Sequence, residues 1–174
     1  LAVGYTSESI SDDQPLPELQ PLMVIILSDT IRDHTKETLE YFHQEGVETK
    51  IISGDNVNTV MAIASKAGVL NYDRCIDMST VDDKDLPKVV QEYTVFGRVT
   101  PNQKKLIVEA LKADGHHVAM TGDGVNDLLA LKDADCSIAI ADGSDASKQI
   151  SQVVLLNSDF TCLPDVLLEG RKVV

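Results

Sequence analysis

Residues 121–127 read Thr-Gly-Asp-Gly-Val-Asn-Asp and place two carboxylates, one amide and two glycines on one short stretch. Asp123 and Asp127 are four residues apart where a turn would enter a helix, so both can lie on the same face. The glycines allow the backbone to approach an anion closely, and a hard cation such as Mg²⁺ prefers carboxylate oxygens. The alternative is a turn whose Asp and Asn only cap a helix. The full string and its flanks favour a magnesium and phosphate site.

Two other places point to the same chemistry. Ser53-Gly54-Asp55 follows the apolar pair Ile51-Ile52, so a hydroxyl and an amide could donate to phosphate oxygens at a strand end; the alternative is that Asp55 caps the next helix. Lys104 follows a helix start at Thr100-Pro101 and could neutralise a phosphate as a point charge. Most lysines are simply solvated, and it is the order of the three segments along the chain that favours a shared site.

The elements that would position these residues alternate between strands and helices. Apolar runs predict strands and 3.6-residue periodicity predicts helices, and such alternation indicates a parallel sheet covered on both faces. Thr100 with Gln103 predicts a capping box, and Gly46 and Gly68 predict helix ends. The strands are expected at 1–5, 22–27, 49–52, 94–96, 117–120, 137–141 and 153–156, and the helices at 33–45, 57–67, 86–93, 101–112, 128–132, 146–152 and from 163.

Composition excludes several classes of protein. The net charge of −13 disfavours nucleic acid and anionic lipid partners. The longest apolar run, 22–27, is too short to cross a bilayer, so a soluble chain is expected. Three separate cysteines fit a reducing compartment better than a disulfide framework or a zinc site. His116 and His117 would point to opposite faces of a strand, which disfavours a metal site there.

The order of these motifs resembles the haloacid dehalogenase superfamily, and specifically the phosphorylation domain of P-type cation-transporting ATPases. Ser53-Gly54-Asp55 resembles that family's Thr-Gly-Asp, Thr100 to Lys104 its Pro-x-x-Lys segment, and Thr121 to Asp127 its Thr-Gly-Asp-Gly-x-Asn-Asp. Further similarities to its Asp-Pro-Pro-Arg, Gly-Ser/Thr-Asp-x-Ala-Lys and membrane-helix entry segments are found at 27–32, 142–148 and 169–171. The resemblance covers about residues 22–174 and implies a Rossmann-like three-layer α/β fold.

The resemblance also implies roles for individual residues. Asp123 would ligate Mg²⁺, and Asp127 would hold the loop and the metal waters. Ser53, Gly54 and Asn126 would bind phosphoryl oxygens, with Lys104 balancing the charge. Four residues would face either the nucleotide, which is ATP, or the hinge: Asp29, Arg32, Asp55 and Arg98.

One family element is missing: no aspartate here is followed by Lys-Thr-Gly, the sequence that accepts the phosphoryl group. We therefore expect a fragment without turnover, in which 1–21 are the tail of the nucleotide-binding domain and a proline-containing hinge, and 22–174 belong to the phosphorylation domain. The family's nucleophile strand lies between the strands that end at Ser53 and Thr121. Its absence would leave two open edges, and we expect Leu22 to Leu27 to fill the gap, from the same chain or from a strand-swapped homodimer.

Three functions remain open at this stage. The leading one is part of an ATP-driven cation pump in the cell membrane, with this domain on the cytoplasmic side and with a nucleotide-binding domain, an actuator domain and membrane helices as partners. The second is a free-standing phosphatase that uses Asp29 as nucleophile, although the spacing disfavours it. The third is a non-catalytic module that binds Mg²⁺ or nucleotide. The transported ion would be chosen by absent membrane helices, with calcium favoured by general resemblance.

Overall fold

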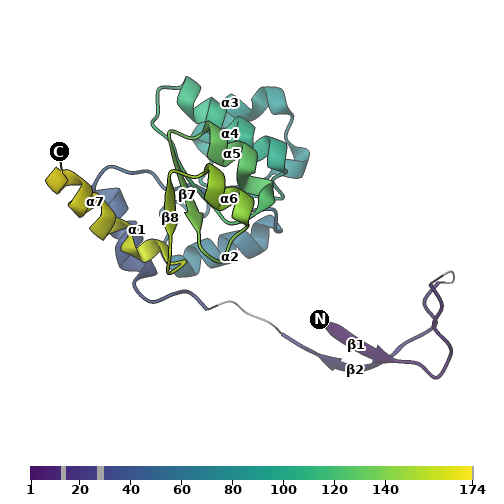
Figure 1. Ribbon diagram of the computed structural model, residues 1–174. Coiled ribbons are helices and arrows are strands. Elements are labelled where there is room, and N and C mark those ends of the chain that lie inside the picture. The colour runs from purple at the N-terminus through teal and green to yellow at the C-terminus, as the bar shows by residue number, and fades with distance from the viewer. Residues whose placement is uncertain (13–14, 27–29, 174) are drawn as a thin grey trace. The chain divides into compact units, whose positions relative to one another are not determined.

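The computed structural model describes residues 1–12, 15–26 and 30–173. The chain divides into two compact units, Leu1–Thr30 and Ile31–Val174. The first is a small hairpin, and the second contains the parallel sheets and all the helices labelled in Figure 1. Asp29 lies outside the described residues.

The hairpin pairs β1 (Ala2–Tyr5) with β2 (Gln20–Val24) in antiparallel register, Ala2 opposite Val24. Backbone hydrogen bonds of 2.8 Å in each direction between Leu1 and Ile25 extend the pairing. Every residue of both strands is exposed. Our expectation that 22–27 fills the central gap of the sheet from the same chain is wrong for its described part, because Leu22–Val24 pair with β1 instead, a closer partner in sequence.

The first parallel sheet has the order β3-β5-β4, with β3 at Ile51–Ile52, β5 at Val95–Gly97 and β4 at Cys75–Asp77. Side chains alternate between its faces, as the two-residue period of a strand requires. Ile51, Val95 and Cys75 pack on one face and Ile52, Phe96 and Ile76 on the other. Both faces are therefore covered, as we expected for a parallel sheet.

Two pairs of helices cover that sheet. On the face of Val95 lie α1 (Thr35–Gln44) and α2 (Val57–Ala67), with Val60 and Ala64 of α2 buried. On the face of Phe96 lie α3 (Leu86–Glu92) and α4 (Pro101–Ala113), which bury Leu86, Val90 and Ile107. The helix α2 has the bounds predicted from the sequence and ends at Gly68, whose φ of 83° is left-handed.

The second parallel sheet has the order β6-β7-β8, with β6 at Ala119–Gly122, β7 at Cys136–Ile140 and β8 at Val153–Leu155. The helices α5 (Leu128–Asp133) and α6 (Asp145–Ile150) pack against it on the side where α3 and α4 also lie (Figure 1). Val108 of α4 packs with Met120 of β6 and Leu131 of α5. Because the neighbouring Ile107 belongs to the first core, α4 joins the two sheets.

The two sheets leave β3 and β6 as edge strands, and none of the strands in the described ranges pairs with their free edges. The α/β fold with parallel strands is confirmed, and no strand of the described residues occupies the position that the resemblance assigns to the nucleophile.

The remaining elements complete the second unit. The helix α7 (Leu163–Val173) lies beside α1 (Figure 1), and the guanidinium of Arg171 pairs with the carboxylate of Glu45, which raises the pKa of Arg171. In the described part of the chain, no helix is both long enough and apolar enough to cross a bilayer. Short 3-10 helices are found at Met78–Thr80 (η1), Asp83–Asp85 (η2), Val125–Asp127 (η3) and Phe160–Cys162 (η4).

Two further features differ from the expectations drawn from the sequence. The strand β4 was not predicted, because its three residues run directly into the acidic stretch that begins at Asp77. His116 and His117 precede β6 rather than forming part of it, and Nε2 of His116 lies 3.4 Å from Oδ2 of Asp114.

Candidate functional site

A cavity of about 500 Å³ opens at the carboxyl ends of the edge strands β3 and β6. Parallel α/β sheets gather ligand groups at that end of their strands. The three sequence segments singled out for phosphate chemistry all contribute to its wall. Its lining residues are Ile52, Ser53, Gly54, Asp55, Lys104, Met120, Thr121, Gly122, Asp123, Asp127 and Ile140.

The turn after β3 is held in place by the neighbouring strand. The amide of Ser53 donates to the carbonyl of Phe96 at 3.0 Å, and the amide of Val99 donates to the carbonyl of Ser53 at 2.9 Å. The Ser53 hydroxyl accepts a 3.1 Å hydrogen bond from the amide of Asp55. The residue that caps α2 is Asn56, whose side chain accepts from the amide of Asn58. The Asp55 side chain is therefore not used as a helix cap.

Lys104 owes its position to the start of α4. Thr100 accepts from the amide of Gln103 at 3.2 Å, and the Gln103 side chain accepts from the amide of Thr100 at 3.1 Å, so the predicted capping box is confirmed. The amide of Gln103's side chain also donates to the carbonyl of Met78 at 3.1 Å, which ties the helix start to η1. Lys104 thus projects from a fixed first turn, and its side chain is only 12% exposed.

Asp127 binds the loop on which Asp123 lies. Its Oδ2 accepts from the amides of Asp123 at 3.2 Å and Gly124 at 3.3 Å, while its Oδ1 lies 2.6 Å from Nζ of Lys104. Gly122 is required beside it, because a Cβ at that position would lie 2.6 Å from Cβ of Asp127. Both carboxylate oxygens of Asp127 are therefore engaged within the protein.

The other predicted residues lie apart from the cavity wall. Asn126 is exposed in η3, directly before Asp127. Arg98 has a left-handed φ of 53° and its Nε lies 3.6 Å from Oδ2 of Asp77. Arg32 is exposed in the loop before α1. Neither arginine lines the cavity.

Sequence reasoning missed the partner of Arg98. Asp77 ends β4, and the hydroxyl and amide of Ser79 both donate to its carboxylate, at 2.5 and 3.0 Å. These hydrogen bonds, with a smaller effect from Arg98, hold the pKa of Asp77 below its usual range. The signal available in the sequence was Asp77-Met78-Ser79, an Asp followed two residues later by Ser, which is a common local turn.

The oxygen atoms at the cavity suit magnesium rather than a softer metal. Asp123 supplies a carboxylate that accepts no hydrogen bond among those found in the described chain, and Mg²⁺ commonly binds one or two carboxylates while keeping several waters. No group of three or more His, Cys, Asp or Glu side chains is arranged to hold a metal within the described ranges. The carboxylate of Asp123 is therefore of the chemical type that suits a hard divalent cation.

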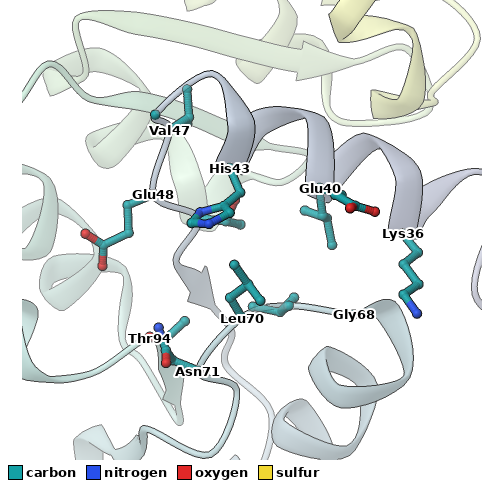
Figure 2. Close-up of a pocket in the computed structure, with 13 residues that line it drawn as sticks. Lys36, Glu40, His43, Val47, Glu48, Gly68, Leu70, Asn71 and Thr94 are labelled. Atoms are coloured by element: carbon teal, nitrogen blue, oxygen red, sulfur yellow. The ribbon is translucent and has the colours of Figure 1, made fainter.

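A second cavity, of about 700 Å³, lies at the opposite ends of the strands and is shown in Figure 2. Lys36, Glu40 and His43 come from α1, and Gly68, Leu70 and Asn71 come from the segment after α2. Thr49 and Thr94, which precede β3 and β5, close one side. None of the motif residues lines it, so its larger volume does not mark it as the phosphate site.

The chain is similar over its whole length to cation-transporting ATPases. The chain is 47% identical over its whole length to the probable cation-transporting ATPase exp7 of Streptococcus pneumoniae, of which it covers 23%. It is 43% identical over its whole length to the calcium-transporting ATPase CtpE of Mycobacterium bovis, of which it covers 22%. The chain therefore spans less than a quarter of the length of these curated relatives.

A solved structure with a similar fold is the catalytic domain of the CPx-ATPase CopB-B. The TM-score is 0.62 and the sequence identity 28%, and the similarity covers 85% of this chain and 47% of that one. A family model described as haloacid dehalogenase-like hydrolase matches residues 3–135. This match spans well over half of the sequence, and the chain belongs to the haloacid dehalogenase-like hydrolases.

Proposed function

We propose that the chain is the distal part of the phosphorylation domain of an ATP-driven cation pump, in which an aspartate outside this chain accepts the phosphoryl group of ATP. One observation carries the proposal: Ser53, Lys104 and Asp123, from three separate segments, line one cavity at the carboxyl ends of β3 and β6. The similarity of the whole of this chain to parts of cation-transporting ATPases supports the proposal.

Each residue takes the role that the family resemblance implies, and its surroundings are compatible with that role. Asp123 ligates Mg²⁺, which when bound neutralises phosphoryl oxygens. The hydroxyl of Ser53 and the amide of Gly54 donate to those oxygens. Lys104 adds positive charge beside them. Asp127 keeps the loop and the ammonium of Lys104 in place, since both of its oxygens are occupied by these partners.

The remaining predicted residues keep the roles that the resemblance implies. Asn126, exposed in η3 directly before Asp127, donates to a phosphoryl oxygen. Asp55 faces the nucleotide from the wall. Asp29, Arg32 and Arg98 contact the nucleotide or the hinge of the intact pump.

The open edges of β3 and β6 receive the strand that carries the acceptor aspartate. That strand comes from an upstream part of the same pump, whose nucleotide-binding domain, actuator domain and membrane helices are the partners of this domain. A strand from a second copy of this chain, forming a homodimer, is the competing occupant. In the pump the domain lies on the cytoplasmic side of the cell membrane and, by its relatives' names, calcium is the favoured ion.

The test combines this chain with a separately purified upstream segment of the same gene product in the presence of Mg²⁺ and γ-labelled ATP. We expect an acid-stable phosphorylated aspartate in the upstream segment only when this chain is added, and none when the chain carries Lys104→Ala or Asp123→Asn. Failure of the wild-type chain to promote labelling would contradict the proposal.

The chain alone should not hydrolyse p-nitrophenyl phosphate with Mg²⁺. Turnover that is abolished by Asp29→Asn would instead establish the free-standing phosphatase. This control needs no partner and separates the two functions directly.

A further inference from the structure

The loop that precedes α6 packs directly behind the loop that carries Asp123. The amide of Ser144 donates to the carbonyl of Asp123 at 2.7 Å. The hydroxyl of Ser147 lies 3.3 Å from the same carbonyl oxygen and 2.7 Å from the carbonyl oxygen of Ser144, so both are within reach of its one proton. Ser147 is completely buried.

The approach of the two loops leaves no room for a side chain. A Cβ added at Gly143 would lie 2.4 Å from the carbonyl oxygen of Asp123 and 3.0 Å from its Cα. Such distances cannot be accommodated without moving the backbone of one loop. Gly143 is therefore needed at this position for close approach.

The loop behind Asp123, residues 141–145, is held by contacts on both sides. Nζ of Lys148 donates to the carbonyl of Ala141 at 3.2 Å and lies 2.8 Å from Oδ1 of Asp145. On the other side the hydroxyl of Ser158 accepts from the amide of Asp142 at 3.0 Å. The atoms that contact Asp123 are thus attached to β7, α6 and the segment after β8.

Together with Asp127, this loop fixes both backbone polar groups of Asp123. The amide of Asp123 donates to Oδ2 of Asp127, and its carbonyl accepts from Ser144. The side chain of Asp123 has no such hydrogen bond among the described residues, so its orientation depends on how its backbone is held. Ligands that are oriented before the metal arrives bind it more tightly, because less conformational freedom is lost on binding.

We infer that Gly143 and Ser147 are positioning residues that hold Asp123 from behind, so that its carboxylate is oriented for the divalent cation. The inference rests on the proposed function for the identity of the ligand, but the backbone contacts can be tested without any ligand. Neither residue touches the cation or the phosphoryl group.

The chain offers matched controls for both substitutions. Ser147→Ala removes the buried hydroxyl at the start of α6, whereas Ser151→Ala removes a buried hydroxyl at its end that has no hydrogen-bond partner in the described chain. Gly143→Ala introduces the close contact with Asp123, whereas Gly170→Ala places a Cβ that meets nothing within 4 Å.

The first measurement is amide hydrogen exchange by NMR without metal. We expect Ser144 to lose about ten-fold of its protection in Ser147→Ala, as about 1.4 kcal/mol of local opening free energy corresponds to ten-fold, while Ser151→Ala leaves it unchanged. Equal protection of Ser144 in the two variants would overturn the inference, whether or not the chain binds a metal.

The second measurement is a titration with Mn²⁺, whose paramagnetism broadens the amide signals of the loop 122–127. We expect Ser147→Ala and Gly143→Ala to weaken binding by about ten-fold or more, as loss of groups that orient a ligand commonly does, with the two controls close to wild type. Wild-type affinity in Ser147→Ala would overturn the positioning role. Absence of broadening in the wild-type chain itself would instead contradict the metal site of the proposed function, while the exchange data still decide whether the loop is held.

Discussion

Nζ of Lys104 lies 2.6 Å from Oδ1 of Asp127, and the two side chains are only 12% and 7% exposed. The pair joins the start of α4 to the loop after β6 and so links the two halves of the cavity. A charge buried in this way is costly once its partner is removed.

Lys104→Met should lower the free energy of unfolding by about 3 kcal/mol, because it leaves the carboxylate of Asp127 buried and unpaired. Urea denaturation followed by circular dichroism measures the change. Lys105→Met is the matched control, since its ion pairs with Glu109 and Asp133 are more exposed and solvent screens them, so its loss should be much smaller than that of Lys104→Met. Equal losses of unfolding free energy in the two variants would show that the buried pair of Lys104 and Asp127 stabilises the chain no more than an exposed pair does.

Asp123→Asn should abolish the stabilisation that Mg²⁺ gives to the chain, because a neutral amide is a poor ligand for a hard cation. The measurement is the melting temperature with and without Mg²⁺ at constant ionic strength. Asp55→Asn removes a carboxylate from the wall of the same cavity and should retain the Mg²⁺ response. If both variants lost the stabilisation by Mg²⁺ equally, the ion would be responding to the overall negative charge of the cavity and not to Asp123 as a ligand.

Thr100→Ala should destabilise the chain by about 1 kcal/mol, as loss of a helix-capping side chain usually does. Thr100→Ser keeps the hydroxyl that accepts from the amide of Gln103 and should recover most of the loss. Denaturation midpoints of the three proteins test this. A serine variant as unstable as the alanine variant would mean that the methyl group of Thr100, not its hydroxyl, matters.

Phe96→Ala should be the most damaging of the substitutions, at about 3–5 kcal/mol, because it opens a cavity in the core between β5 and the helices α3 and α4. Phe96 is fully buried, whereas Leu156 is 86% exposed. Leu156→Ala is therefore the control and should change the free energy of unfolding little. A small effect at Phe96 would contradict the packing of the first sheet.

Asp135 should give the chain a pH-dependent stability on the acid side. Its carboxylate accepts from the amide of Val118 at 2.9 Å and pairs with Lys112, and these contacts, the amide first, hold its pKa below the ordinary value of 3.8. Because the folded state has the lower pKa, the contribution is complete above the unfolded value and is lost as pH falls through the folded one.

The check is a comparison of wild type with Asp135→Asn across that range. The difference in unfolding free energy between the two should be constant near neutral pH and shrink as pH falls below about 4, where the carboxyl is protonated first in the unfolded chain and then, at lower pH, in the folded one. A difference that does not change with pH would show that the ionised carboxylate makes no contribution through its charge.

Much of the fold could be predicted because strong local signals were present. The helix α2 has a regular apolar stripe between Asn56 and Gly68, and α4 begins at a capping box, so both were located from the sequence. The strand β4 could not be found, because three residues give no periodicity and its pairing with β5 is a long-range contact.

The site was predictable as a set of residues but not in every contact. The order of the three segments along the chain indicated that Ser53, Lys104 and Asp123 would meet, and they line one cavity. The pairing of Arg98 with Asp77 and the approach of Gly143 to Asp123 depend on how separate loops pack together. No local pattern encodes such packing, and the same is true of the hairpin that pairs β2 with β1.

The central claim is that three segments together bind a metal-bound phosphoryl group. An NMR titration with inorganic phosphate in the presence of Mg²⁺ tests this claim most directly. The account predicts shifts of the amide signals of Ser53, Gly54 and Asp123 and of the side-chain signals of Lys104, all saturating together and all requiring Mg²⁺. Shifts confined to the cavity of Figure 2, at residues such as His43 and Leu70, or no saturable shift at Ser53, Lys104 and Asp123, would contradict it.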